Sequence, residues 1–193
     1  MQLYLSGPRA FHSTYHDANG QAIYKVRTSS QVFGRTTTVS RILRNEILYD
    51  HSMRDIFGHL AQIEWKSFRS SILRFYGREM RTRSFFKKQG WGWHGCDRVF
   101  AAPDGREYRW KLGTAAPEAG ILDLTLYLMA NPYLSQLRSH NEKQTLVARF
   151  NPGGNSCFFS ARSPFLEILP AGEHIADAIV VSFVYIEKLR EDE

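Results

Sequence analysis

Two basic residues at a two-residue spacing are the first feature of the sequence that could carry chemistry. Lys25 and Arg27 flank Val26 in a segment of alternating residues. Side chains two positions apart point to the same face of a β-strand, so both cations could grip one phosphorylated headgroup. The alternative is a solvated strand face, on which long basic side chains cover apolar surface and bind nothing.

A second basic group follows in the middle of the chain, and it consists of Arg78, Arg81, Arg83, Lys87 and Lys88. We expect Arg81 and Arg83 to share one strand face, with the two lysines just beyond it. Each basic residue near an anionic membrane contributes about 1 kcal/mol, so five acting together could hold the protein at a surface in a salt-sensitive way. The alternative is that these charges protect an edge strand against aggregation.

The charge distribution favours an acidic partner. The chain of 193 residues has a formal net charge of +6, divided as +3 over residues 1–68, +7 over 69–111 and −4 over 112–193. Such a surface attracts phospholipid headgroups, nucleic acid or acidic proteins. Aromatic residues among the cations could stack bases, but strand aromatics more often fill a core, and no nucleic-acid-binding signature is present. Nucleic acid is therefore the unfavoured partner.

Catalytic and metal-binding patterns are sparse. His12 and His16 could share a strand face, but they have no third ligand and no carboxylate partner in the sequence. The GxSxG, HExxH and GxxxxGK[ST] motifs are absent. Cys96 and Cys157 lack CxxC spacing, which favours buried free thiols in a reducing compartment. We therefore expect no enzyme, no cofactor and no metal, in a cytoplasmic protein that could also be peripheral to a membrane or nuclear.

Two hairpins are the clearest structural elements. Asp17–Gly20 forms a turn before the alternating segment 21–28, and Pro103–Gly105 forms a turn between segments 98–102 and 106–112. Asn-Gly and Asp-Gly turns between alternating segments are typical of β-hairpins. We expect Tyr24 and Val26 on one face of the first hairpin, and Tyr108 and Trp110 on one face of the second.

Further strands are predicted between and after the hairpins, namely at 32–42, 60–66, 70–76, 80–85, 91–94, 121–129, 146–150, 156–161 and 165–169. A short helical turn is predicted at Phe85–Gln89. Residues 131–145 are predicted as a surface excursion, with a helical turn around Tyr133–Leu137. The total is about a dozen short strands, which is typical of a sandwich or barrel, and we expect a single domain over residues 1–193.

The last apolar segment determines the architecture. Residues 175–186 are almost uninterruptedly apolar, which requires enclosure on every side but falls short of the about 20 residues that a membrane span needs. Acidic residues at its start and basic residues at its end favour a helix over a buried strand. We expect a buried axial helix over 173–190 inside an antiparallel barrel. Its wall is predicted to include Tyr24, Val26, Ile63, Trp65, Tyr108, Trp110, Val147 and Phe150.

This order of features resembles the tubby C-terminal domain superfamily, which also holds the phospholipid scramblases and the LURP-one-related plant proteins. The resemblance lies in the paired hairpins, in the aromatic strand ending at Trp110–Gly113, and in the final segment 177–190. Four phrases are similar to a fungal family of uncharacterised tubby-like domains: Phe33–Thr38, Ala61–Trp65, Arg98–Tyr108 and Tyr185–Arg190. The resemblance implies a barrel of roughly twelve antiparallel strands closed around a hydrophobic helix.

The resemblance also implies a function. Tubby domains are associated with phosphoinositide binding through a Lys-x-Arg pair and another basic residue, and Lys25-Val26-Arg27 has that form. We expect a non-catalytic module that binds anionic phospholipid, with phosphoinositide as a candidate, through a basic face. The alternative is a protein-interaction or structural domain whose partner binds a sheet edge or the segment Ile121–His140. A scramblase-like role is disfavoured, because no segment could span a bilayer.

Overall fold

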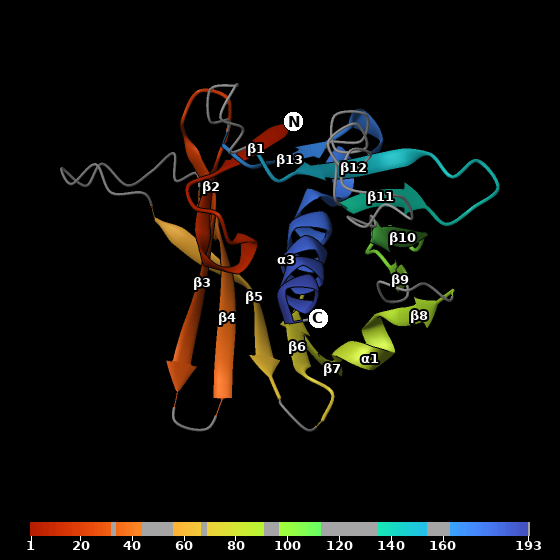
Figure 1. The fold of residues 1–193 in the computed structure, drawn as a ribbon, viewed down its shortest axis with the longest axis horizontal. Helices are drawn as coiled ribbons and strands as arrows, with labels where there is room; N and C mark the ends of the chain where they lie inside the picture. Colours follow the sequence, from red (N-terminus) through yellow and green to blue (C-terminus); the bar gives the residue numbers. More distant parts are fainter. Residues whose placement is uncertain are drawn as a thin grey trace, which may run out of the picture. The chain divides into compact units, whose positions relative to one another are not determined.

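The computed structural model describes residues 1–31, 34–43, 56–66, 69–90, 97–112, 135–153 and 163–192 (Figure 1). These residues are mainly β, with thirteen strands in antiparallel order and a helix near the C-terminus. Several predicted features lie outside the described residues: Cys96, Cys157, and the strands at 91–94, 121–129 and 156–161.

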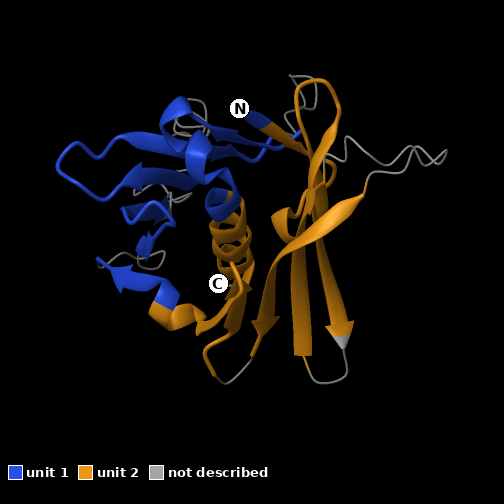
Figure 2. Cartoon of the chain, turned by 180° about the vertical axis from the view of Figure 1, so that it is seen from behind, with its two compact units in different colours: residues 1–2, 85–179 blue, residues 3–84, 180–193 orange. Residues whose placement is uncertain are grey.

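The chain forms two compact units, neither of which is a single continuous segment (Figure 2). Unit 2 holds residues 3–84 and 180–193, and unit 1 holds residues 1–2 and 85–179. Strand β1 (Gln2–Leu5) and helix α3 (Ala176–Asp192) both contain residues of each unit.

Unit 2 contains an antiparallel sheet in which each strand pairs with its neighbour in sequence. Its strands are Leu3–Leu5 of β1, β2 (Ser13–His16), β3 (Ala22–Gln31), β4 (Gly34–Ile42), β5 (Phe57–Trp65), β6 (Ile72–Phe75) and β7 (Arg78–Arg81). Two short helices accompany them, η1 (Ala10–His12) and α1 (Thr82–Phe85), whose last residue belongs to unit 1. Tyr24 and Val26 are buried and Arg27 is exposed, as the alternation predicts.

Unit 1 follows the same up-and-down plan. Its strands are β8 (Lys87–Gln89), β9 (Asp97–Ala101), β10 (Glu107–Leu112), β11 (Ser135–Ser139), β12 (Leu146–Asn151) and β13 (Phe165–Ile168). The first residues of the chain extend this sheet, since the Ile168 amide donates to the Met1 carbonyl at 2.8 Å. Tyr108, Trp110, Val147 and Phe150 are buried as predicted. The 3₁₀ helix η2 (Pro170–Ile175) then leads into α3.

The predicted closed barrel is not confirmed. The strand order runs from β7 at one edge to β8 at the other, and no pairing joins these two strands among the described residues. The strand count, the antiparallel order and the helix near the C-terminus agree with the prediction. The expectation of a single domain stays a prediction.

The two predicted hairpin turns are confirmed, and each is held by an aspartate. The Asp17 carboxylate accepts hydrogen bonds from the amides of Asn19 and Gln21, both at 2.9 Å. Asp104 likewise accepts from the Arg106 amide at 3.0 Å. Gly20 and Gly105 adopt φ values of +80° and +77°, a conformation that glycine reaches without steric cost.

The prediction for residues 80–89 is wrong in its boundaries, because the helical turn begins at Thr82, directly after β7, and residues 87–89 form a strand instead of a helical turn. Thr82–Phe85 is helix α1, and Lys87–Gln89 is strand β8. The packing of Phe85 and Phe86 explains the difference. Both rings contact Phe100, with centroids at 5.6 and 5.9 Å, whereas consecutive residues of a strand would point to opposite faces.

A second correction concerns the predicted surface excursion at 131–145. Residues 135–139 are not a helical turn but strand β11, which pairs with β10 on one side and β12 on the other. Leu137 is completely buried there. Tertiary pairing has overridden a local sequence without clear strand alternation.

The buried helix is confirmed. Eleven consecutive residues of α3, from Ala178 to Lys188, are buried, which is three full turns with no exposed face. The chain packs closely in unit 1 just before the helix, where a Cβ on Gly172 of η2 would lie 2.5 Å from Val147 and 2.9 Å from Ile179 of α3. The later turns of α3 pack in unit 2, where Phe183 meets Tyr15 edge-on at 6.5 Å.

Helix burial yields a direct test at Val180, which has no exposed surface. Val180→Asp places an unpaired charge where solvent cannot reach it, at a cost of several kcal/mol. Because domains are stable by only about 5–15 kcal/mol, we expect loss of soluble protein and of a cooperative melting transition. Ile56→Asp is the control, because Ile56 is 44% exposed and should tolerate the same charge. Equal yields and melting temperatures for the two variants would contradict the buried helix.

Candidate functional site

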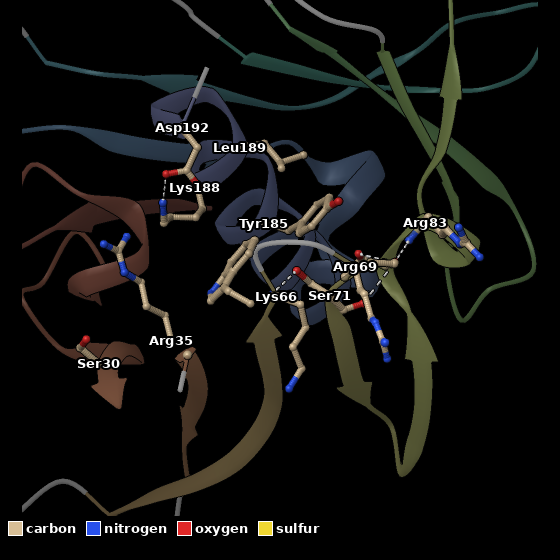
Figure 3. Close-up of a pocket in the computed structure, with 14 residues that line it drawn as sticks. Ser30, Arg35, Lys66, Arg69, Ser71, Arg83, Tyr185, Lys188, Leu189 and Asp192 are labelled. Carbon is tan, nitrogen blue, oxygen red and sulfur yellow. Dashed lines mark hydrogen bonds and ion pairs between the residues drawn. The ribbon is translucent and has the colours of Figure 1, made fainter. Parts of the chain in front are cut away.

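A cavity of about 730 Å³ lies in unit 2, where strand ends meet the last turns of α3 (Figure 3). The strand pairing explains its position, because the end of β3, the start of β4, the end of β5 and the start of β6 all reach one end of the sheet. Five groups line it: Ser30 with Arg35, Trp65 with Lys66, Arg69 to Ser71, Thr82 with Arg83, and Tyr185 with Lys188, Leu189 and Asp192. We call this cavity the basic hollow.

A second cavity of about 610 Å³ shares Lys66, Arg69 and Arg83 with the basic hollow and adds Arg81. Among the described residues, the guanidinium groups of Arg35, Arg69, Arg81 and Arg83 have no carboxylate within salt-bridge distance. Lys66 contacts Glu64 at 3.5 Å. Uncompensated cations around a concave surface raise the local concentration of anions, and guanidinium groups match phosphate oxygens in pairs.

Side-chain hydroxyls fix the backbone that carries two of these arginines. Ser70 Oγ accepts a hydrogen bond from the Arg83 amide at 3.2 Å and lies 3.3 Å from Thr82 Oγ1. Ser71 Oγ accepts from the Lys66 amide at 3.2 Å, and the Ser71 carbonyl accepts from the Thr82 amide at 2.8 Å. The segment before β6 is thereby tied to α1, which sets the positions of Arg69 and Arg83 before any ligand binds.

Two aromatic rings form part of the wall. Trp65 and Tyr185 stack with centroids 5.7 Å apart and planes 3° from parallel. Trp65 Nε1 donates to Thr37 Oγ1 at 2.7 Å, and Thr37 Oγ1 lies 2.7 Å from Thr28 Oγ1. The indole is held in one orientation beside the cations. Trp65 was predicted in the buried wall, but it is only half-buried, because its ring borders the basic hollow.

One cation of the basic hollow is buried. The Lys188 side chain is 4% exposed, and its ammonium group forms an ion pair with the carboxylate of Asp192, which is 55% exposed. The same ammonium lies 5.2 Å from the centre of the Phe11 ring, which adds a cation–π contact. Lys188 is thus fixed by packing, while its partner faces solvent.

The sequence-predicted basic residues are distributed over several elements. Arg81 and Arg83 border the two cavities, but the prediction of a shared strand face is wrong, because Arg81 ends β7 and Arg83 belongs to α1. Arg78 lines another cavity, with Arg74 and Tyr76. Lys25 lies 5.3 Å from the Phe57 ring. Arg27 is exposed on β3; Lys87 and Lys88 belong to unit 1, where Lys87 pairs with Glu107 at 3.2 Å.

Sequence reasoning missed Arg35, Lys66, Arg69 and Lys188. A usable signal was present, because antiparallel neighbours alternate in direction and the ends of four consecutive strands must meet. Each of Arg35, Lys66 and Arg69 lies next to such an end. The position of Lys188 could not be found this way, since it depends on where the last turn of α3 lies.

Unit 1 contains a separate hydrogen-bonded group, formed by Asp104, Tyr108 and His174. Tyr108 donates to Asp104 Oδ2 at 2.7 Å, and His174 Nε2 lies 3.0 Å from the same oxygen. Burial alone would raise the pKa of Asp104, but hydrogen bonds from Tyr108, the Arg106 amide and His174 outweigh it and hold that pKa below its usual value. Burial and the neighbouring carboxylate raise the pKa of Tyr108 to about 12. The group ties the second hairpin turn to η2.

The predicted histidine pair is divided between two elements. His12 lies in η1 and His16 in β2, so the two do not belong to one strand. Within the described ranges, no group of three metal-ligating side chains comes together. No helix of the described part is both long enough and apolar enough to cross a bilayer.

Comparison with known proteins gives one match. Residues 8–192 match the model of a family of unknown function, DUF6593. No curated protein and no solved structure matches the chain. The matched family is uncharacterised, as the resemblance implied, while kinship to tubby domains stays a prediction.

The Asp104 group predicts how stability depends on pH. Because the folded-state pKa of Asp104 lies below its unfolded value, its contribution is present above pH about 4 and is lost as pH falls through the folded pKa. Asp104→Asn should therefore lower the free energy of unfolding by about 1–2 kcal/mol at pH 7, and by less below pH 4. Urea unfolding between pH 3 and pH 7 measures both values.

Asp17→Asn is the matched control, because Asp17 holds the corresponding turn of the first hairpin and accepts only backbone amides there. An asparagine oxygen can accept the same bonds, so its loss should be smaller. A difference between wild type and Asp104→Asn that is constant over the pH range would contradict the assigned role.

Proposed function

Since the chain belongs to the DUF6593 family, whose function is unknown, we propose its role from its own residues: a non-catalytic module that binds anionic phospholipid at a membrane surface. Phosphoinositide is the headgroup that we favour. The observation that carries the proposal is the basic hollow, where four arginines without carboxylate partners among the described residues surround two adjoining cavities.

The chemistry of the basic hollow suits a phosphorylated headgroup. Arginine binds phosphate through paired hydrogen bonds, and Arg69 and Arg83 are held on a fixed backbone by Ser70 and Thr82. Hydroxyl groups of Ser30 and Ser70 border the same space and could hydrogen-bond a polyol ring. The stacked pair of Trp65 and Tyr185 offers a flat apolar wall to such a ring. The cations, hydroxyl groups and aromatic rings of the basic hollow together favour a phosphorylated polyol headgroup over the carboxylate of a fatty acid.

A membrane surface would add long-range attraction to this local recognition. Three of the exposed arginines, Arg69, Arg81 and Arg83, lie in the sequence segment of +7 charge, residues 69–111. Basic residues near an anionic bilayer each contribute about 1 kcal/mol, and this contribution falls with ionic strength. Lys25 and Arg27 on β3 belong to unit 2, as the basic hollow does, and stay candidate contributors to its basic face. Lys87 and Lys88 on β8 belong to unit 1 and stay candidates of that unit alone.

The test is co-sedimentation with vesicles of phosphatidylcholine containing phosphatidylinositol 4,5-bisphosphate, at low and moderate salt. Phosphatidylcholine vesicles with and without phosphatidylserine serve as comparisons. We expect Arg69→Gln with Arg83→Gln to weaken binding about 30-fold, because two cations are lost from one headgroup site. The backbone bond from the Arg83 amide to Ser70 is retained in this variant.

Lys25→Gln with Arg27→Gln is the charge-matched control, since it removes two cations from β3 and none from the basic hollow. A much smaller loss is expected for this pair. Equal losses for the two pairs would remove the basic hollow as the site. Absence of binding to every vesicle at low salt would reject the lipid proposal and favour a protein-interaction domain.

A further inference from the structure

We propose that Lys188 is a second anion-binding position of the basic hollow, and that Asp192 occupies it until a phosphate group of the ligand displaces the carboxylate. This inference rests on the proposed function and names how its site is completed. The starting observation is that a carboxylate of the chain itself already binds a cation inside the hollow (Figure 3).

The two partners of this ion pair differ in how firmly they are held. Among the described cations that line the basic hollow, Lys188 alone is buried. A buried ammonium requires a compensating anion, because leaving it unpaired costs several kcal/mol. Asp192 is more than half exposed. Another anion could therefore replace it without moving the cation.

The position of Asp192 at the end of α3 is electrostatically unfavourable for its carboxylate. Asp192 is the last residue of α3, where the helix dipole places partial negative charge and where an acidic side chain is unfavourable. The pair also has the weaker of the two orientations, with the lysine four residues before the acid. A phosphate group carries more charge and more acceptor oxygens than a carboxylate. Because it is not part of the helix, it does not have to lie at the negative end of the helix dipole as Asp192 does. These three terms favour exchange.

The position of Lys188 implies a ligand with more than one anionic group. In Figure 3, Lys188 and Arg35 lie on one side of Tyr185, whereas Arg69 and Arg83 lie on the other. One phosphate between Arg69 and Arg83 would leave Lys188 and Arg35 for a second. We therefore expect a bisphosphorylated headgroup to gain more from the exchange than a monophosphorylated one.

The experiment compares wild type with Asp192→Asn, using phosphatidylcholine vesicles that contain either phosphatidylinositol 4-phosphate or phosphatidylinositol 4,5-bisphosphate. Inorganic pyrophosphate, followed by tryptophan fluorescence, is the soluble arm and separates a lipid requirement from phosphate binding. Removing the competing carboxylate should tighten binding of the bisphosphate vesicles about two- to fivefold, the range of an exposed or half-exposed ion pair. A smaller gain is expected with the monophosphate.

Glu191→Gln is the matched control. Glu191 lies in the same helical turn and carries the same charge, but it pairs with Arg9 at 3.1 Å and does not line the basic hollow. A gain for Asp192→Asn with none for Glu191→Gln supports the proposal. Equal changes for the two variants, or no gain for Asp192→Asn, would overturn it while leaving wild-type lipid binding intact.

The proposed function fails separately, by absence of binding in wild type. If wild type does not bind and Asp192→Asn does, the Asp192 carboxylate blocks Lys188 and the ligand does not displace it, which overturns the proposed exchange. If neither protein binds any vesicle or pyrophosphate, both proposals fall. Asparagine keeps an oxygen that can accept from Lys188, and melting temperatures measured beside wild type verify that each variant is folded.

Discussion

The burial of α3 is the constraint on which the other features depend. Three turns without a polar face cannot be left in water, and the apolar area of side chains such as Phe183 and Ile186 is worth about 2 kcal/mol each when fully buried. Each unit supplies its own contacts. In unit 1, Val147 packs against the residues that precede and begin the helix; in unit 2, Tyr15 and Trp65 face its aromatic side chains.

The charged residues at the end of α3 begin where its buried apolar run ends. Glu187 and Lys188 are buried, yet each has a charged partner within the same helix, Arg190 and Asp192 respectively. Each of these two buried charges is therefore paired with an opposite charge of the helix itself. Because the partners lie toward the helix end, the charged groups gather where strand ends also bring Arg35 and Lys66. The basic hollow therefore lies where the buried part of α3 ends, at Lys188.

Much of the fold could be predicted from the sequence. Turn chemistry identified both hairpins, alternation identified their buried faces, and the apolar run identified the helix. Local pattern failed at residues 80–89 and at residues 135–139, for different reasons. Phe85 and Phe86 share one contact, Phe100, which a continuous strand would not allow, and residues 135–139 become a strand because partners exist on both sides. Neither fact can be read from neighbouring residues.

The candidate site was less accessible to sequence reasoning. Lys25 and Arg27 were noticed because two cations stand close together in the chain, whereas the basic hollow draws its cations from β4, β5, α1 and α3. Proximity of that kind depends on strand direction and on helix length. Arg81 and Arg83 were identified through local charge density, but their arrangement depended on a helix boundary at Thr82 that the alternating pattern concealed.

The interleaving of the two units along the chain bears on how the protein is made. Residues 180–193 belong to unit 2 together with residues 3–84, and the whole of 85–179 is translated between them. On the ribosome, the seven strands of unit 2 are therefore incomplete until α3 emerges, because Tyr15 and Trp65 lack their ring contacts with Phe183 and Tyr185. Contacts of such sequence separation slow folding and prolong exposure of apolar strands. Nascent chains of this protein should depend on chaperone protection until residues 180–193 have left the ribosome.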